Sequence, residues 1–333
     1  MSERIDRLPS GLTVGIEEMP WTRTVSIGVY VGVGARDESH EQSGVSHFLE
    51  HLLFKGTADR SAQDISRAVD RVGGDINAFT SKEYTAFFCR LPARYAVEGI
   101  ELHGDVLTSP SLRDADVESE RQVILEELAM DDDSPDDVVH REFARQIFAG
   151  HPLGRDTAGE RATVRSTKAS DIREFCAAHY VTGATTVVVA GDVDHGDVVA
   201  AVEDAFAALP VGDGRIVRRA PGAAEADVEI DDDSEQVHLA IGGRSVPRHD
   251  PDREALDVVN HVFGGGLSSR LFDEIRERPP IARCTCSESS SIASSSRITW
   301  RSLSMSRSVI SEFVSTSPSS SMPVAPWRRG MRQ

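Results

Sequence analysis

The pattern of hydrophobic and polar positions over residues 1–209 alternates between strand-like and helix-like segments. Runs of β-branched and apolar residues with the spacing of strands lie at 11–16, 25–31, 76–91 and 185–190. Apolar residues recur at helical spacing at 45–53, 62–72, within 95–148, and from 195 to Leu209. We expect the first two strands to pair as an opening hairpin. Together these segments predict an α+β domain, with an antiparallel-rich sheet and helices packed on it.

A linker and a second unit are predicted after this domain. Residues 210–227 are rich in Gly, Ala and Pro, which is typical of a linker. A strand-like run at 237–243 and a helix-like run at 252–262 then repeat the order of strand, loop and helix seen in the first domain. We interpret residues 228–278 as the start of a duplicated, inactive copy of the first domain, and this second copy is incomplete.

The composition changes abruptly after residue 278. Asp273 is the last aspartate of the chain, and serine and arginine dominate residues 279–333. A disordered serine-rich linker is one interpretation of this segment. We favour a shift of reading frame near codon 279, and we expect 279–333 to be an aberrant, disordered tail.

The helix-like segment 45–53 places its histidine and glutamate side chains on one face. His47 and His51 are four residues apart, and Glu50 lies three residues after His47, so the three side chains share a face. The other face is apolar and consists of Val45, Phe48, Leu49, Leu52 and Leu53. Histidine and carboxylate side chains are ligands of zinc. A solvated polar face would show the same pattern, so the zinc interpretation depends on a third ligand elsewhere in the sequence.

The segment 116–128 supplies a candidate for that ligand. Glu120 and Glu127 are seven residues apart and lie beside an apolar stripe formed by Val117, Ile124 and Leu128. A carboxylate on the core side of a helix is costly unless it is paired, protonated or bound to a metal. Glu127 as a zinc ligand, with Glu120 behind it orienting a histidine, removes this cost. The alternative is a charged helix whose register is fortuitous.

Two motifs in this order resemble a known family. The pattern His-x-x-Glu-His at 47–51, followed by Glu-Arg-x-Val-Ile-x-x-Glu at 120–127, is similar to the inverted-motif zinc proteases of the pitrilysin/insulinase family. The likeness is to the branch with the β subunit of mitochondrial processing peptidase and its small prokaryotic relatives. Further matches, in family order, lie at 73–81, 151–154, 187–192 and 263–272.

The resemblance implies a zinc-dependent endopeptidase that hydrolyses bonds in peptides or unfolded segments. His47, His51 and Glu127 would hold one Zn²⁺ per chain, and Glu120 would orient a ligating histidine. Glu50 would be the general base for a zinc-bound water. The resemblance also implies two domains that face each other around the peptide, and it allows a homodimer or a heterodimer with a related subunit.

Substrate binding is implied at two places. Asn77, Ala78 and Phe79 would form a sheet edge onto which the substrate adds as an extended strand. Arg276 matches the first residue of a pair that holds a substrate carbonyl, but the second position is Arg283 where relatives have tyrosine. This departure supports an alternative function, in which the chain is a catalytically silent peptide-binding or partner subunit with a truncated second domain.

Composition limits the partners and the compartment. The net charge of −18 argues against nucleic acid as a partner. Abundant Asp and Glu with only three lysines resembles the acidic protein surfaces of a salt-loving cytosol. The N-terminus has neither the basic start nor the apolar core of a secretory signal, no run is long enough to cross a membrane, and the four cysteines do not suggest a disulfide scaffold. We therefore expect a cytoplasmic protein with no membrane association.

Overall fold

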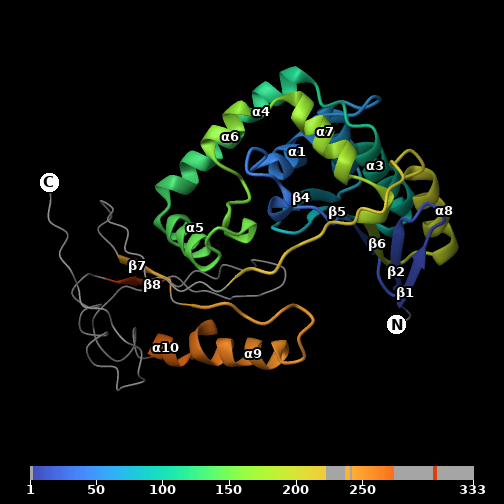
Figure 1. Cartoon of the computed structure of the whole chain (residues 1–333). Coiled ribbons are helices and arrows are strands. Elements are labelled where there is room, and N and C mark those ends of the chain that lie inside the picture. Colours follow the sequence, from blue (N-terminus) through green and yellow to red (C-terminus); the bar gives the residue numbers. More distant parts are fainter. Residues whose placement is uncertain (1–2, 223–236, 241, 274–302, 306–333) are drawn as a thin grey trace, which may run out of the picture. The chain divides into compact units, whose positions relative to one another are not determined.

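The computed structural model describes residues 3–222, 237–240, 242–273 and 303–305 (Figure 1). The chain divides into two compact units. Among the described residues, the first unit holds 3–222 and 242–253, and the second holds 237–240, 254–273 and 303–305. The predicted metal ligands and the predicted base all belong to the first unit.

A six-stranded sheet forms the centre of the first unit, in the order β1-β2-β6-β3-β5-β4. Only β2 and β6 run parallel, and every other neighbouring pair is antiparallel. The strands are β1 (Glu3–Arg7), β2 (Thr13–Glu18), β3 (Thr24–Val31), β4 (Asp75–Thr80), β5 (Thr85–Pro92) and β6 (Thr185–Gly191). The predicted antiparallel-rich sheet is confirmed, and β4 is one of its two edges.

The predicted opening hairpin is wrong. β6 lies between β2 and β3, so that Val187 is the register partner of both Val14 and Val29. β6 is a nearly continuous apolar run, and such a strand is stabilised most at the centre of a sheet. The true hairpin partner of β2 is β1, whose sequence Glu-Arg-Ile-Asp-Arg is polar, as suits an edge strand. That polarity is why the strand pattern missed β1.

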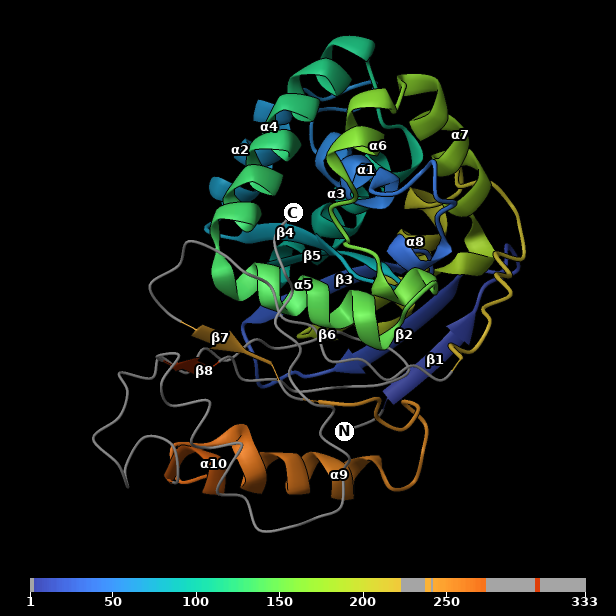
Figure 2. The same ribbon diagram turned by 60° about the vertical axis from the view of Figure 1, so that its left-hand side comes forward.

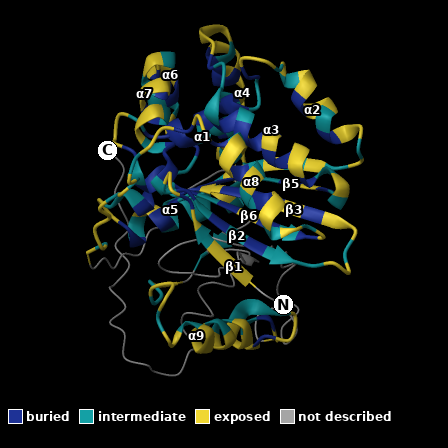
Figure 3. Cartoon of the chain, turned by 90° about the vertical axis from the view of Figure 1, so that its right-hand side faces the viewer, coloured by how far each residue is buried: buried dark blue, intermediate teal, exposed yellow. Residues whose placement is uncertain are grey.

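Helices cover one face of the sheet (Figure 3). α3 packs on β3 and β5, and α8 packs on β2. The strand residues that face them alternate with exposed ones: in β3, Val25, Ile27, Val29 and Val31 are buried, whereas Thr24, Ser26 and Tyr30 are exposed. The helices are α1 (Val45–Leu53), α2 (Ala62–Asp70), α3 (Ala96–Thr108), α4 (Asp114–Asp133), α5 (Pro135–Ile147), α6 (Arg161–Ser166), α7 (Ala169–His179) and α8 (His195–Ala205).

α1 lies between α4 and α7 (Figure 2). All five residues of its predicted apolar face are almost completely buried in the main core. Val117, Ile124 and Leu128 of α4 are buried in the same core. Because both helices bury the apolar sides that the sequence predicted, their histidine and glutamate sides are turned toward one another.

The second unit contains short elements in the part that the structure describes. β7 (Val237–Leu239) pairs antiparallel with β8 (Leu303–Met305), and α9 (Arg253–Asn260) is followed by a π-helical turn at His261–Gly265 and by α10 (Arg270–Phe272). The predicted helix at 252–262 is therefore present, and the predicted strand at 237–243 is shorter than expected. The linker at 210–227, the duplication at 228–278 and the aberrant tail stay predictions, since 223–236 and most of 279–333 lie outside the described residues.

Candidate metal centre and general base

The first turn of α1 is held by an acceptor from the preceding loop. Gly44 at the helix N-terminus has φ +94°, and a Cβ there would come within 2.6 Å of the carbonyl oxygen of Ala158. The backbone N–H groups of Gly44 and Ser46 each donate to the buried carboxylate of Glu38, at 2.8 Å. The backbone just before His47 is therefore held by the Glu38 carboxylate and by the close approach of Gly44 to Ala158.

Three donor atoms meet between α1 and α4. The Nε2 atoms of His47 and His51 are 3.2 Å apart. Glu127 Oε2 lies 3.9 Å from Nε2 of His47 and 3.6 Å from Nε2 of His51. Within the described residues, this is the one group of three or more His, Cys, Asp and Glu side chains whose ligand atoms all lie within 4.8 Å of one another.

The chemistry of these donors fits zinc. Two imidazole nitrogens and one carboxylate oxygen form a ligand set found in catalytic zinc sites, which keep a further position open. Burial, assisted by the neighbouring His51, lowers the pKa of His47 to about 4. The ring of His47 is therefore neutral near pH 7, which is the form that binds a metal.

Glu120 links His51 to a lysine. Its Oε2 atom lies 3.2 Å from Nδ1 of His51, and its Oε1 atom lies 2.6 Å from Nζ of Lys55. A proton on Nδ1 that is donated to Glu120 leaves Nε2 of His51 free to face His47 and Glu127. The sequence predicted Glu120 in this place and missed Lys55. Lys55 lies four residues after His51 and just beyond the end of α1, and this spacing was the available signal.

Glu50 lies beside the donors and is held from the sheet. Thr80, the last residue of β4, donates its hydroxyl proton to Glu50 Oε2 at 2.5 Å. Burial raises the pKa of Glu50 above its ordinary value, opposed by the hydrogen bond from Thr80 and the charge of His51. A carboxylate with a raised pKa is a better proton acceptor near neutral pH. Thr80 directly follows the predicted segment Asn77–Phe79, and it was not among the site residues predicted from the sequence.

The predicted substrate-binding residues lie on the free edge of the sheet. Asn77 and Phe79 are exposed on β4, and Ala78 lies between them with partial burial. The N–H of Ala78 donates to the side-chain Oδ1 of Asn77, at 2.8 Å. This N–H therefore points away from β5 and toward the open edge. Arg276, the other predicted substrate residue, lies outside the described residues.

Comparisons with known proteins identify the family. The sequence profile described as Insulinase (Peptidase family M16) matches residues 13–161, and the profile described as Peptidase M16 inactive domain matches residues 166–295. An uncharacterized zinc protease of Bacillus subtilis is 32% identical over 87% of this chain and 71% of that protein. The chain belongs to the M16 peptidase family. The resemblance predicted from the motifs at 47–51 and 120–127 is thereby confirmed.

A further sequence relative of this M16 chain is also named a zinc protease, and two solved structures share its fold. An uncharacterized zinc protease of Streptomyces coelicolor is 42% identical over 86% of this chain, and the chain spans 64% of that protein's length. A protease from Helicobacter pylori shares the fold, with a TM-score of 0.84 and 24% identity over 94% of this chain and 78% of that one. A Pseudomonas fluorescens structure described as a peptidase M16 inactive domain has a TM-score of 0.83 and 19% identity, over 96% of this chain and 81% of that one.

None of the helices in the described residues combines the length and the apolar character that crossing a bilayer requires.

Proposed function

We propose that this M16 chain is a zinc endopeptidase that hydrolyses bonds in peptides or unfolded segments. The observation that carries the proposal is the convergence of His47, His51 and Glu127, with the half-buried carboxylate of Glu50 on the same helix as both histidines. These three residues would hold one Zn²⁺, and Glu120 would keep His51 in the tautomer that binds it. The names of the relatives as zinc proteases support this assignment.

Zinc bound there would supply a water of lowered pKa and would polarise the scissile carbonyl. Glu50 accepts the proton of the attacking water and later donates it to the leaving amine. The hydrogen bond from Thr80 occupies Oε2 of Glu50, so its other oxygen is the one available to the water.

The substrate would bind as an added strand on β4. Asn77, Ala78 and Phe79 present the free edge. The outward N–H of Ala78, which donates to Asn77 Oδ1 in this structure, would pass to a carbonyl of an extended peptide when the Asn77 side chain turns away. Pairing through main-chain groups selects an unfolded segment, since a folded protein offers few free strands. Arg276 would bind a substrate carbonyl from the second domain.

Partners and compartment follow from the same proposal. M16 relatives with an active and an inactive domain suggest a homodimer or a heterodimer with a related subunit around the substrate. The strongly acidic composition favours a cytoplasmic location and argues against nucleic acid as a partner.

A catalytically silent peptide-binding or partner subunit is the second candidate. One observation favours it: Arg283 stands where the resemblance places a tyrosine that would assist Arg276.

Cleavage of an unstructured peptide, with and without a chelator, tests the proposal. The zinc-loaded chain should cleave a fluorogenic peptide of this kind, and the Glu50→Gln variant should lose cleavage while it retains one zinc per chain. A matched control is Glu126→Gln, an exposed glutamate of α4. Undiminished cleavage by Glu50→Gln would remove Glu50 as the base. Peptide binding without turnover by the unmutated chain would favour the silent subunit.

A further inference from the structure

The hydrogen bond from Thr80 to Glu50 fixes only one end of a longer chain of contacts. Thr80 is followed by the turn Ser81–Tyr84, which joins β4 to β5. The backbone N–H of Ser81 donates to the carbonyl of Tyr84 at 2.9 Å. The side chain of Ser81 donates to the same carbonyl, also at 2.9 Å. The position of the Thr80 hydroxyl therefore depends on how firmly this turn is held.

The loop after β3 holds one side of the turn. The N–H of Ala35 donates to the carbonyl of Ser81 at 3.2 Å, and the N–H of Arg36 donates to the carbonyl of Lys82 at 2.7 Å. The side chain of Arg36 forms an ion pair with Glu83, and both side chains are buried. Two backbone hydrogen bonds and a buried ion pair thus join the loop to the turn.

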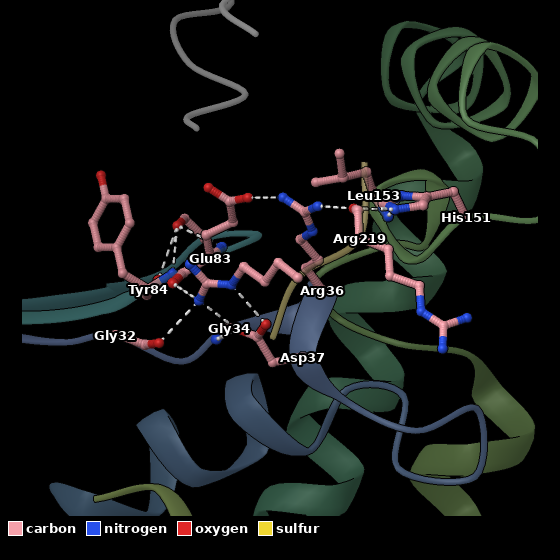
Figure 4. Close-up of polar contacts among 11 residues, drawn as sticks. Gly32, Gly34, Arg36, Asp37, Glu83, Tyr84, His151, Leu153 and Arg219 are labelled. Carbon is pink, nitrogen blue, oxygen red and sulfur yellow. Dashed lines mark hydrogen bonds and ion pairs between the residues drawn. The ribbon is translucent and has the colours of Figure 1, made fainter. Parts of the chain in front are cut away.

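A segment far along the chain holds the other side. The guanidinium of Arg218 donates from Nη2 to the carbonyl oxygens of Glu83, at 2.7 Å, and Gly32, at 2.9 Å. It also forms a bidentate pair with Asp37, at 2.8 Å and 2.7 Å. Figure 4 labels these three partners, Gly32, Asp37 and Glu83. Arg218 therefore contacts the loop after β3, the short helix at Ala35–Asp37 and the β4–β5 turn at the same time.

The carboxylate that Arg218 pairs with has little access to water. The side chain of Asp37 is 1% exposed, and that of Arg218 is 29% exposed. Breaking such a pair leaves a buried charge without its partner, which disrupts the local structure more strongly than the loss of a surface pair does. The next residue adds a contact of its own, since the carbonyl of Arg219 accepts hydrogen bonds from Arg36 and, at 3.0 Å, from His151.

We propose that Arg218 and Thr80 are positioning residues for Glu50, and that Arg218 acts through the turn Ser81–Tyr84. Arg218 fixes the turn, the turn fixes the Thr80 hydroxyl, and the hydroxyl holds one oxygen of Glu50 so that the other faces the reacting water. The inference rests on the proposed peptidase function. It places a residue of the predicted linker, outside the family motifs, in the arrangement of the base.

Kinetics of single and double variants test this order of contacts. Thr80→Val, which removes the hydroxyl and keeps the shape, should lower kcat by about tenfold to a hundredfold with KM changed less than twofold. Thr80→Ser should restore most of kcat. Arg218→Met should lower kcat by about tenfold, and Arg218→Lys, which keeps the charge but not the bidentate geometry, by less. Zinc content should not change in any of them.

The double variant separates positioning from general destabilisation. If Arg218 acts through Thr80, Arg218→Met should reduce kcat little further in the Thr80→Val background. Multiplying losses would overturn the proposed order of contacts. Arg173→Met is the matched control, because Arg173 also contacts a carbonyl, that of Leu112, and a carboxylate, that of Asp114, at a distant place on α7. It should leave kcat unchanged.

A measurement without catalysis distinguishes failure of this inference from failure of the peptidase assignment. Amide hydrogen exchange at Ser81 and Tyr84 should become at least about tenfold faster in Arg218→Met and stay unchanged in Arg173→Met. Unchanged exchange in Arg218→Met would overturn the role of Arg218, whether or not the chain cleaves peptides. If the unmutated chain does not cleave peptides but exchange is faster in Arg218→Met as expected, only the peptidase function would be overturned.

Discussion

The carboxylate of Glu38 accepts a hydrogen bond from the backbone N–H of Ser46, one residue before the first histidine of the metal centre. Its second oxygen accepts from the N–H of Gly44, and the residue is only 4% exposed. Glu38 thus satisfies two N–H groups at the N-terminus of α1, which would otherwise be buried without partners. Glu38 therefore anchors the N-terminal end of the helix that carries His47, Glu50 and His51.

Removing the Glu38 carboxylate should therefore destabilise the first unit. Glu38→Ala leaves two buried N–H groups without acceptors, and the expected loss is about 2–4 kcal/mol in the free energy of unfolding. Chemical denaturation followed by circular dichroism measures this loss. Glu41→Ala, at a neighbouring exposed position, should change the stability by less than about 0.5 kcal/mol. Equal stability of Glu38→Ala and the unmutated chain would contradict the anchoring role.

The same residue should make stability depend on pH. Burial raises the pKa of Glu38 to about 7, against the lowering effects of the two N–H groups and of Arg155. Between the ordinary carboxyl pKa of 4.5 and about 7, the folded state binds more protons than the unfolded state, so stability falls as pH rises through this window. The loss is about 3 kcal/mol at most, and it is complete above about pH 8.

Denaturation at several pH values tests whether stability falls as pH rises. Glu38→Gln cannot titrate, so its stability should lack the decline between pH 5 and pH 7 that Glu38 gives the unmutated chain. The difference between the two proteins should be constant above about pH 8. Parallel pH profiles across the whole range would show that the pKa of Glu38 is not raised.

The contact between Glu120 and His51 leads to a prediction on metal affinity. Glu120→Gln should weaken zinc binding by about tenfold to a hundredfold, because the amide fixes the His51 tautomer less firmly than the carboxylate does. Lys55→Met should act in the same direction and more weakly, since the ammonium group of Lys55 contacts Glu120 and acts on His51 through it. Competition with a coloured chelator measures both affinities. If Glu120→Gln binds zinc as tightly as the Glu126→Gln control, Glu120 does not support the metal centre.

Periodicity explains why so much of the centre could be predicted from the sequence. A helical repeat places His47, Glu50 and His51 on one face of α1, and the cost of burying a carboxylate singles out Glu120 and Glu127 on α4. Both arguments are local, and each apolar stripe also predicts which side of its helix is buried. Two such helices in contact bring their polar sides together, as the distances among the ligand atoms show.

Contacts between distant segments were not predictable in this way. Glu38, Thr80 and Arg218 act through hydrogen bonds that cross from one loop, strand or helix to another, and no repeat in the sequence marks them. The insertion of β6 between β2 and β3 is a similar case, because strand order depends on pairing between residues more than 150 positions apart. Local alternation predicts that a strand exists, and it does not predict its neighbour.

The free edge of β4 leads to the final prediction. Ala78→Pro removes the N–H that points away from β5, so it should leave the pairing of β4 with β5 intact. Binding of a labelled unstructured peptide to the Glu50→Gln variant, followed by fluorescence anisotropy, should weaken by about fivefold or more, which corresponds to the loss of one backbone hydrogen bond. Ala78→Ser keeps the N–H and should bind the peptide like the parent. Zinc content and thermal stability should be the same in the two variants, so that a difference in peptide affinity can be assigned to the edge of β4. Equal affinity of Ala78→Pro and Ala78→Ser would show that the peptide does not add to the sheet through the Ala78 N–H.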